Sequence, residues 1–316
     1  MDKFNETRLL VKIASLYYEH DLNQSAIAQR LHLSQSFVSR ALRRCNTEGI
    51  VRFSIAHPTG THITLENDLQ ERHLINQVII VDVEDSATEK TIKRAIASAA
   101  VAYLESTLRG DELIGLSSWS SFIGAMVEQI HHKTASAQGV IQILGGVGHN
   151  ENLQANIVTN ELARLLDCKA YLLPTKSFGR NPDYKPTQLE NDELEQVVKL
   201  FPNVDVAIVG IGAKEPSDLV RKAGIFYQEE TKTELTSRHA VGDLCLHYYD
   251  RKGQAILSEE DDPVISMSLA QLKACNNVVA LAGGLHKVDA ILGALAGGYL
   301  DVLITDCLTA QKMMEG

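Results

Sequence analysis

The sequence has 316 residues, of which 45% are hydrophobic, and it carries a formal net charge of −10. Its length exceeds that of a usual single domain and its apolar content can bury a sizeable core, so we expect two domains. The acidic balance excludes a protein coated on all sides with basic residues, as a non-specific nucleic-acid binder would be.

The chain opens with three short predicted helices. Apolar side chains lie on one stripe from Leu9 to Tyr18, which predicts an amphipathic helix. A second helix is predicted from Gln24 to Leu31, with Asn23 as its N-cap. After a tight connection, Ser34 is well suited to cap a third helix from Gln35 to about Asn46. This succession is typical of a helix-turn-helix DNA-binding domain.

The outer face of the third predicted helix suits a DNA major groove. Arginine and glutamine form bidentate hydrogen bonds with base edges, and serine hydroxyls bond to bases or phosphates. We expect Gln35, Ser36, Ser39 and Arg40 to set base preference, and Gln24, Arg43 and Arg44 to set mainly the strength of binding.

The alternative for this segment is a small three-helix bundle with a solvated face. No Asp or Glu occurs between Leu22 and Thr47, whereas a solvated face usually mixes both signs and a phosphate-facing one cannot. Through Ala56 the sequence has 8 Lys and Arg against 5 Asp and Glu. A mildly basic head on an acidic body therefore favours a protein that touches DNA at one end only.

Three short features connect the two expected domains. They are a strand from Ile50 to Ile55, a hinge at His57–Gly60 and a linking helix from Leu65 to Leu74. We accordingly expect a DNA-binding domain at residues 1–56, a linker with its helix at 57–75, and an effector-binding and oligomerisation domain at 76–316.

From Gln77 onward, short apolar runs alternate with longer helical stretches. This alternation predicts a Rossmann-like, doubly wound α/β domain, in which helices cover both faces of a mostly parallel sheet. The predicted strands are Val78–Val83, Leu113–Leu116, Val140–Leu144, Ala170–Leu173, Val204–Val209, Leu244–Tyr248, Val278–Leu281 and Val302–Ile304.

Serines and glycines follow several of these strands, at the edge where doubly wound sheets bind ligands. Hydroxyls and backbone amides there can cradle a phosphate or sugar hydroxyls, although ordinary helix caps and turns would use the same residue types. The residues expected to bind an effector on this ground are Ser117, Ser118, Trp119, Ser120, Ser121, Gly145, Gly146, Gly148, Gly210, Gly212, Gly283 and Gly284.

Two charged residues join this set. Asp243 begins a predicted strand, where a carboxylate is unfavourable without partners, and it can accept hydrogen bonds from sugar hydroxyls. Lys287 lies at a helix start, where an anion would offset its unfavourable interaction with the helix dipole. Each has a simpler alternative as a solvated surface charge, and we expect the acidic run Glu259–Asp262 to be a solvated loop.

The sequence resembles the SorC family of sugar-responsive bacterial regulators over nearly its whole length. The likeness lies in Leu16–Val51 and in three later motifs, which read "VDVAIVGIGA" (Val204–Ala213), "AVGDLCLHYYDRKG" (Ala240–Gly253) and "VVALAGGLHKVDAILGALAGGYLDVLITDCLTA" (Val278–Ala310). The order and spacing of these motifs are specific to the family.

The resemblance implies a winged-helix-type head, a sugar-phosphate-isomerase-like effector domain and a homotetramer on operator DNA. It implies that Asp243 and Lys287 lie in the effector site, together with the glycines and the loop Ser117–Ser121, and that the lysine meets a phosphate. The chain departs from the family at Ser120, where glycine is common after the tryptophan. This departure leaves open whether the effector is phosphorylated.

We therefore expect a cytoplasmic regulator with three partners: operator DNA, a sugar or sugar-phosphate effector and further copies of itself. The alternatives are a phosphosugar isomerase or deaminase, for which no second acid or base is evident, and an architectural DNA binder, which conflicts with the acidic body. The five cysteines are widely spaced and no apolar run reaches membrane-spanning length, so we expect no metal, no cofactor and no membrane segment.

Overall fold

The computed structural model describes residues 3–52, 58, 60–130, 136–145, 152–173, 192–214, 233, 235–262 and 264–315. The chain divides into two compact units, Met1–Pro58 and Thr59–Gly316. Among the described residues, no helix is both long and apolar enough to cross a membrane.

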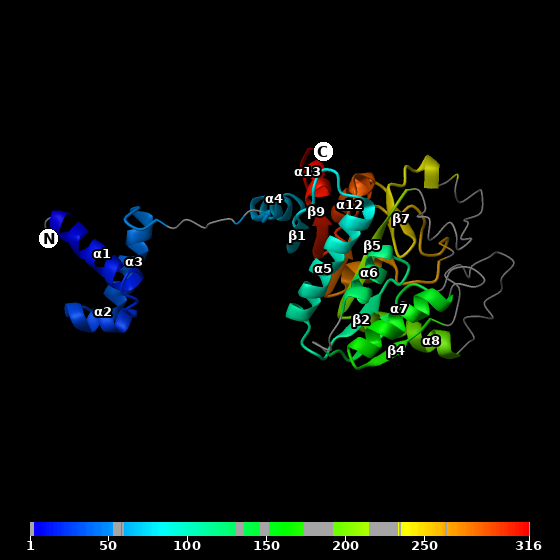
Figure 1. Ribbon diagram of the computed structural model, residues 1–316, viewed down its shortest axis with the longest axis horizontal. Coiled ribbons are helices and arrows are strands. Elements are labelled where there is room, and N and C mark those ends of the chain that lie inside the picture. Colours follow the sequence, from blue (N-terminus) through cyan, green and yellow to red (C-terminus); the bar gives the residue numbers. More distant parts are fainter. Residues whose placement is uncertain are drawn as a thin grey trace. The chain divides into compact units, whose positions relative to one another are not determined.

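The first unit consists of α1 (Lys3–Tyr18), α2 (Gln24–Leu31) and α3 (Gln35–Thr47) (Figure 1). α1 begins six residues before the predicted start at Leu9, whereas α2 and α3 begin after the predicted caps. Asn23 Oδ1 accepts a hydrogen bond from the Ala26 amide at 2.9 Å, and Ser34 Oγ accepts one from the Phe37 amide at 3.2 Å. The strand expected at Ile50–Ile55 is not formed in its described part, residues 50–52, and its remainder lies outside the described residues.

The Ser34 cap provides a test of how this unit is held. We expect Ser34→Ala to destabilise α3 by about 1 kcal/mol, because a first-turn amide loses its acceptor. Amide hydrogen exchange along α3 measures this change, with the exposed Ser25→Ala in α2 as the control. Unchanged protection of the α3 amides in the Ser34 variant would contradict the assignment of Ser34 as a stabilising cap.

The second unit is an α/β domain, as predicted. Its strands are β1 (Gln77–Val81), β2 (Leu113–Leu116), β3 (Gly139–Gln142), β4 (Lys169–Tyr171), β5 (Val206–Ala213), β6 (Gly242–Leu244), β7 (His247–Tyr249), β8 (Asn277–Leu281) and β9 (Val302–Asp306). Its helices are α4 (Ile63–His73), α5 (Glu89–Thr107), α6 (Ser121–Gln129), α7 (Asn152–Leu165), α8 (Asp192–Val198), α11 (Leu269–Ala274), α12 (Val288–Ala296) and α13 (Cys307–Glu315), with 3₁₀ turns η2 (Phe201–Asn203) and η3 (Leu285–Lys287).

The main sheet has the order β1-β9-β8-β5-β2-β3-β4 with parallel pairing throughout. Alternate residues of each strand enter different cores. In β5, Val206 and Ile208 join α5, α6 and α7 in one core, whereas Ala207 and Val209 join α4, α12 and α13 in the other (Figure 1). The sheet is therefore covered on both faces, which explains its continuous apolar runs.

The linking helix α4 belongs to the second unit. Glu66 Oε1 accepts a hydrogen bond from the Ile80 amide and Gln70 Oε1 one from the Val78 amide, both at 2.9 Å. Because β1 is an edge strand, these side chains satisfy amides that would otherwise lack partners. Leu69 of α4 is fully buried in the core of the α/β unit, so α4 packs as part of this unit.

The predicted strand Leu244–Tyr248 is wrong. These residues form a hairpin, in which β6 and β7 pair antiparallel and Leu244 faces His247. The two residues between them, Cys245 (φ 51°) and Leu246 (φ 68°), both have left-handed backbone conformations. The hairpin pairs through β6 with the end of β5, and so it stands above the carboxyl edge of the main sheet.

The order of the strands also locates the ligand crevice expected for this fold. From β2 the chain continues to β3 and β4 on one side, and it later returns to β5 on the other side of β2. Doubly wound sheets bind ligands where the strand order changes direction in this way, outside the carboxyl ends of the strands.

Candidate functional site

The outward face of α3 has the composition expected of a DNA-reading helix. Val38, Ala41, Leu42 and Cys45 are buried, as predicted. Ser36, Arg40 and Arg43 follow at intervals of four and three residues on the opposite side and are exposed, because 3.6 residues make one helical turn. Of the other predicted contacts, Gln35 and Arg44 are exposed, and Gln24 and Ser39 are half-buried.

Arg44 differs from its neighbours on this helix because it has two acidic partners. Its guanidinium lies 2.6 Å from Glu6 of α1 and 2.7 Å from Glu48. The hydrogen bond from Arg44 lowers the pKa of Glu6. Arg44 therefore links α1 to the end of α3 through exposed ion pairs, which add little stability, and a phosphate contact at Arg44 takes the place of one of them.

A pocket lies at the carboxyl ends of β2 and β5, with an empty volume of about 610 Å³ that includes its open mouth. The residues that line it are Ser117, Trp119, Ser120, Ser121, Phe122, Leu144, Gly210, Ile211, Gly212, Ala213, Asp243, Cys245, Leu246, Tyr248 and Lys287.

The loop Ser117–Ser120 between β2 and α6 is fixed by hydrogen bonds to the protein interior. Trp119 Nε1 donates a hydrogen bond to the Gly145 carbonyl at 2.8 Å, and the Ser118 hydroxyl lies 2.7 Å from that of Thr159. Ser118 thus faces the protein interior, whereas Ser120 caps α6 without a side-chain cap bond. The loop is held rigidly by two of its residues, which leaves Ser117, Ser120 and Ser121 at the pocket wall.

Glycines in β5 make room for the polar side chains of the pocket. A Cβ added at Gly212 would collide with the Asp243 carboxylate, and one added at Gly210 would collide with the Ser120 side chain. We expected these glycines to leave room for a ligand. The structure instead uses the space for neighbouring side chains, and the space beside Gly210 is filled by Ser120.

Asp243 is a buried carboxylate in the pocket wall. It is only 8% exposed, and its Oδ2 accepts a hydrogen bond from the Leu246 amide at 3.0 Å. Burial raises the pKa of Asp243 to about 6, although the Leu246 amide and the Lys287 charge act in the opposite direction. A carboxylate kept in such surroundings is poised to accept hydrogen bonds from a ligand.

Lys287, the last residue of η3, places its ammonium group in the same pocket. Its Nζ donates to the Ile211 carbonyl at 2.6 Å and lies 5.1 Å from the centre of the Phe122 ring. Burial lowers the pKa of Lys287, while Asp243 acts to raise it. The pocket thus combines a carboxylate with an ammonium group that lies over an aromatic ring. This arrangement can bind a polyol by polar and apolar contacts together.

A buried polar chain supports the hairpin turn at the mouth of the pocket. His247 Nδ1 lies 2.7 Å from Asp262 Oδ2, and its Nε2 lies 2.7 Å from the Ser266 hydroxyl. Ser266 Oγ in turn donates to the Cys245 carbonyl at 2.9 Å. Asp262, expected in a solvated loop, is instead 6% exposed. This hydrogen-bonded chain of side chains fixes the turn at Cys245 and Leu246, whose residues line the pocket.

Several predicted effector residues lie outside the pocket lining. Gly145 anchors Trp119, and the Gly284 amide donates to Asp306 Oδ2 at 2.9 Å. Gly283 leaves room for that same carboxylate. Gly146 and Gly148 lie outside the described residues. These observations favour packing for Gly283 and Gly284 over ligand contact.

Sequence reasoning also missed part of the pocket. Phe122, Ile211, Cys245, Leu246 and Tyr248 line it without having been predicted. Burial raises the pKa of the Cys245 thiol to about 12, so the thiol is protonated and contributes shape to the pocket. The only signal for these residues was their proximity in sequence to Ser121, Gly212 and Asp243.

Fold and site together define a two-unit protein, with a helix-turn-helix unit and an α/β unit that contains a small-molecule pocket. The family model described as "Putative sugar-binding domain" matches residues 57–315. The chain belongs to this family and, like its relatives, is a SorC-type transcriptional regulator with a sugar-binding domain, not an enzyme.

Two regulators illustrate the similarity over the full chain. The sorbitol operon regulator of Klebsiella pneumoniae is 27% identical over 318 residues and covers 100% of both chains. The deoxyribonucleoside regulator of Bacillus subtilis is 27% identical over 318 residues, which cover 100% of this chain and 99% of that one.

Solved structures agree with these sequence matches. The full-length sorbitol operon regulator SorC from Klebsiella pneumoniae superposes with a TM-score of 0.71 at 28% identity, over 97% of this chain and 98% of that one. The "Putative sugar-binding domain of transcriptional regulator DeoR" from Pseudomonas syringae pv. tomato has a TM-score of 0.64 at 43% identity, over 81% of this chain and 100% of that one.

Proposed function

We propose that this regulator changes its affinity for operator DNA when a sugar or sugar phosphate occupies the pocket beside Asp243 and Lys287. The observation that carries the proposal is the presence of the buried Asp243 carboxylate and the half-buried Lys287 ammonium in one cavity at the carboxyl edge of the sheet. Asp243 accepts hydrogen bonds from ligand hydroxyls, and Phe122 and Tyr248 provide apolar surface for the carbon skeleton.

Lys287 determines which form of sugar fits best. Its Nζ contacts a neutral carbonyl, that of Ile211, and it can also bond to a ligand phosphate or hydroxyl. The Ser120 hydroxyl stands beside Gly210, so it supplies a further donor while narrowing the cradle. Both a polyol and its phosphate satisfy this chemistry, and the experiment below separates them.

The DNA partner is proposed to be a duplex operator read by α3. Gln35, Ser36, Ser39 and Arg40 provide base contacts, while Gln24, Arg43 and Arg44 bind phosphates. We further propose that the protein acts in the cytoplasm as a homotetramer, as the resemblance to the SorC family implies. Effector binding must then favour one arrangement of the oligomer, typically by about 1–3 kcal/mol for a coupled site.

A thermal-shift screen of the full chain with sugars, polyols and their phosphates tests this function. We expect at least one compound to stabilise the protein, since a ligand that binds only the folded state raises its melting temperature. The same compound should change the affinity for DNA from the protein's own promoter region. A stabilising compound that leaves DNA affinity unchanged would contradict the proposed coupling.

The phosphate question is answered by comparing the wild type with Lys287→Met. If the effector is phosphorylated, this change should weaken the binding of the sugar phosphate by about tenfold or more, because a charged hydrogen bond contributes about 1.5–3 kcal/mol. It should change the binding of the unphosphorylated sugar little. Equal losses for both compounds would assign Lys287 to the sugar hydroxyls.

A further inference from the structure

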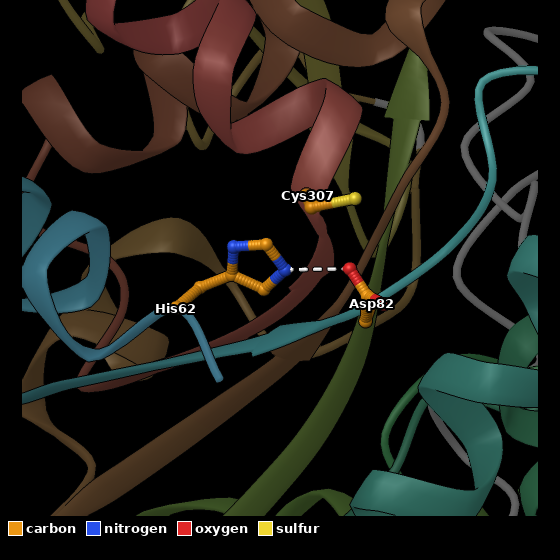
Figure 2. Close-up of side chains that lie close together, drawn as sticks. All are labelled: His62, Asp82 and Cys307. Carbon is orange, nitrogen blue, oxygen red and sulfur yellow. Dashed lines mark hydrogen bonds and ion pairs between the residues drawn. The ribbon is translucent and has the colours of Figure 1, made fainter. Parts of the chain in front are cut away.

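Three potential metal ligands lie together in the second unit, and none of them lines the pocket beside Asp243. His62 Nε2 lies 2.8 Å from Asp82 Oδ1, and these atoms and Cys307 Sγ all lie within 4.8 Å of one another (Figure 2). Figure 2 shows the three side chains grouped together although they come from three separate segments. We refer to His62, Asp82 and Cys307 as the His-Asp-Cys cluster.

The fold brings these segments together for clear reasons. In the parallel pair of β1 and β9, Val81 is opposite Asp306, so the next residues, Asp82 and Cys307, leave the sheet side by side. His62 precedes α4 as its N-cap residue, and α4 packs along β1. The cluster therefore rests on two strand ends and one helix start.

The surroundings of Cys307 suit a thiolate ligand. Its Sγ lies 3.4 Å from the Val83 amide, which donates to it, and 3.4 Å from the Val83 carbonyl. When a metal displaces the thiol proton, the hydrogen bond from Sγ to the Val83 carbonyl is lost, whereas the Val83 amide continues to donate to the negative sulfur. Cys307 is buried while Asp82 is exposed, so an ion could enter from the solvent side.

We propose that the His-Asp-Cys cluster binds a divalent zinc ion. Imidazole nitrogen, thiolate sulfur and carboxylate oxygen together form a ligand set that zinc prefers, and three protein ligands leave the fourth tetrahedral position to water. Binding replaces the hydrogen bond between His62 and Asp82 and releases the Cys307 proton. The sequence argued against zinc only because the three ligands share no short spacing.

Zinc at this position has a structural consequence. His62 lies four residues after Pro58, the last residue of the first unit. An ion shared with Asp82 and Cys307 ties the start of α4 to the ends of β1 and β9. Because the unfolded chain does not hold the three ligands together, zinc stabilises the folded α/β unit.

Titration of the metal-free full chain with Co²⁺ tests the proposal, since cobalt replaces zinc in such sites and reports on its ligands. We expect one Co²⁺ per chain, a thiolate-to-cobalt charge-transfer band and tetrahedral d–d bands, all removed by Zn²⁺ competition. Cys307→Ser should abolish the charge-transfer band. His62→Gln and Asp82→Asn, which keep side chains of similar size, should weaken Co²⁺ binding by about tenfold or more.

Matched controls are Cys168→Ser and His239→Gln, which remove the same side-chain types elsewhere and should leave both band and affinity unchanged. Thermal unfolding without metal verifies that each variant is folded. The proposal is overturned if no charge-transfer band forms, if the band survives Cys307→Ser, or if a control variant loses it equally. Zn²⁺ that binds but fails to raise the melting temperature of the wild type would overturn the structural consequence.

Discussion

Asp243→Asn is expected to weaken effector binding by about tenfold to a hundredfold, because the pocket loses a charged hydrogen-bond acceptor that contributes about 1.5–3 kcal/mol. The substitution preserves the size of the side chain and keeps an oxygen for the Leu246 amide. Isothermal titration with the compound found by thermal shift measures the loss. Unchanged affinity would remove Asp243 from the binding site.

The same substitution should stabilise the protein without ligand. The folded-state pKa of Asp243 is raised to about 6 from 3.8, so the folded protein holds its proton more tightly than the unfolded chain between these values. The wild type therefore loses stability as pH rises through this window, by about 3 kcal/mol in total, and the penalty is constant above it.

Denaturation at several pH values separates this effect from general changes in acid stability. The gain in unfolding free energy of Asp243→Asn over the wild type should be near zero below pH 4 and largest above pH 6. Asp289→Asn, which changes an exposed carboxylate paired with Arg251, serves as control and should show no such rise. A pH-independent difference would contradict the burial argument.

Arg40→Ala is expected to reduce specific DNA binding by about 1–3 kcal/mol and to relax the choice of base at one position. Arg40 lies on the exposed side of α3, where its guanidinium can reach a base edge. Binding to the operator and to a set of single-base variants measures both effects. Full operator selectivity in the variant would exclude Arg40 from the reading face.

Arg43→Ala is the matched comparison on the same helix. Its side chain is expected to contact phosphate, so its loss should weaken binding to all sequences alike and lower the slope of affinity against salt by about 1. Measuring both variants at several salt concentrations therefore distinguishes base contact from phosphate contact. A loss of base selectivity in the Arg43 variant would reverse the two assignments.

Local patterns predicted the helices of the first unit, the linking helix and the parallel strands well. The bounds of α2 matched the prediction because Asn23 supplies the cap within the same segment. The start of α3 was equally clear from Ser34. The alternation of apolar runs and helices likewise predicted the α/β fold, since strands buried on both faces need apolar side chains throughout.

The candidate site was less predictable because distant residues determine it. The hairpin at Leu244–Tyr248 was missed, since its turn residues Cys245 and Leu246 carry none of the usual Gly or Asn signals. Asp262 was expected in solvent because its partner, His247, lies fifteen residues away. Only the folded chain shows that the two form one buried network.

The turn at Cys245 and Leu246 limits which substitutions the regulator can tolerate in its pocket. Backbone angles that favour glycine cost roughly 1–3 kcal/mol for each larger residue, yet both side chains face the ligand space. Glycine at either position would relax the backbone and also remove a wall of the cavity. Engineering for heat resistance alone would thus select, at these two positions, variants with a weakened hold on the proposed effector.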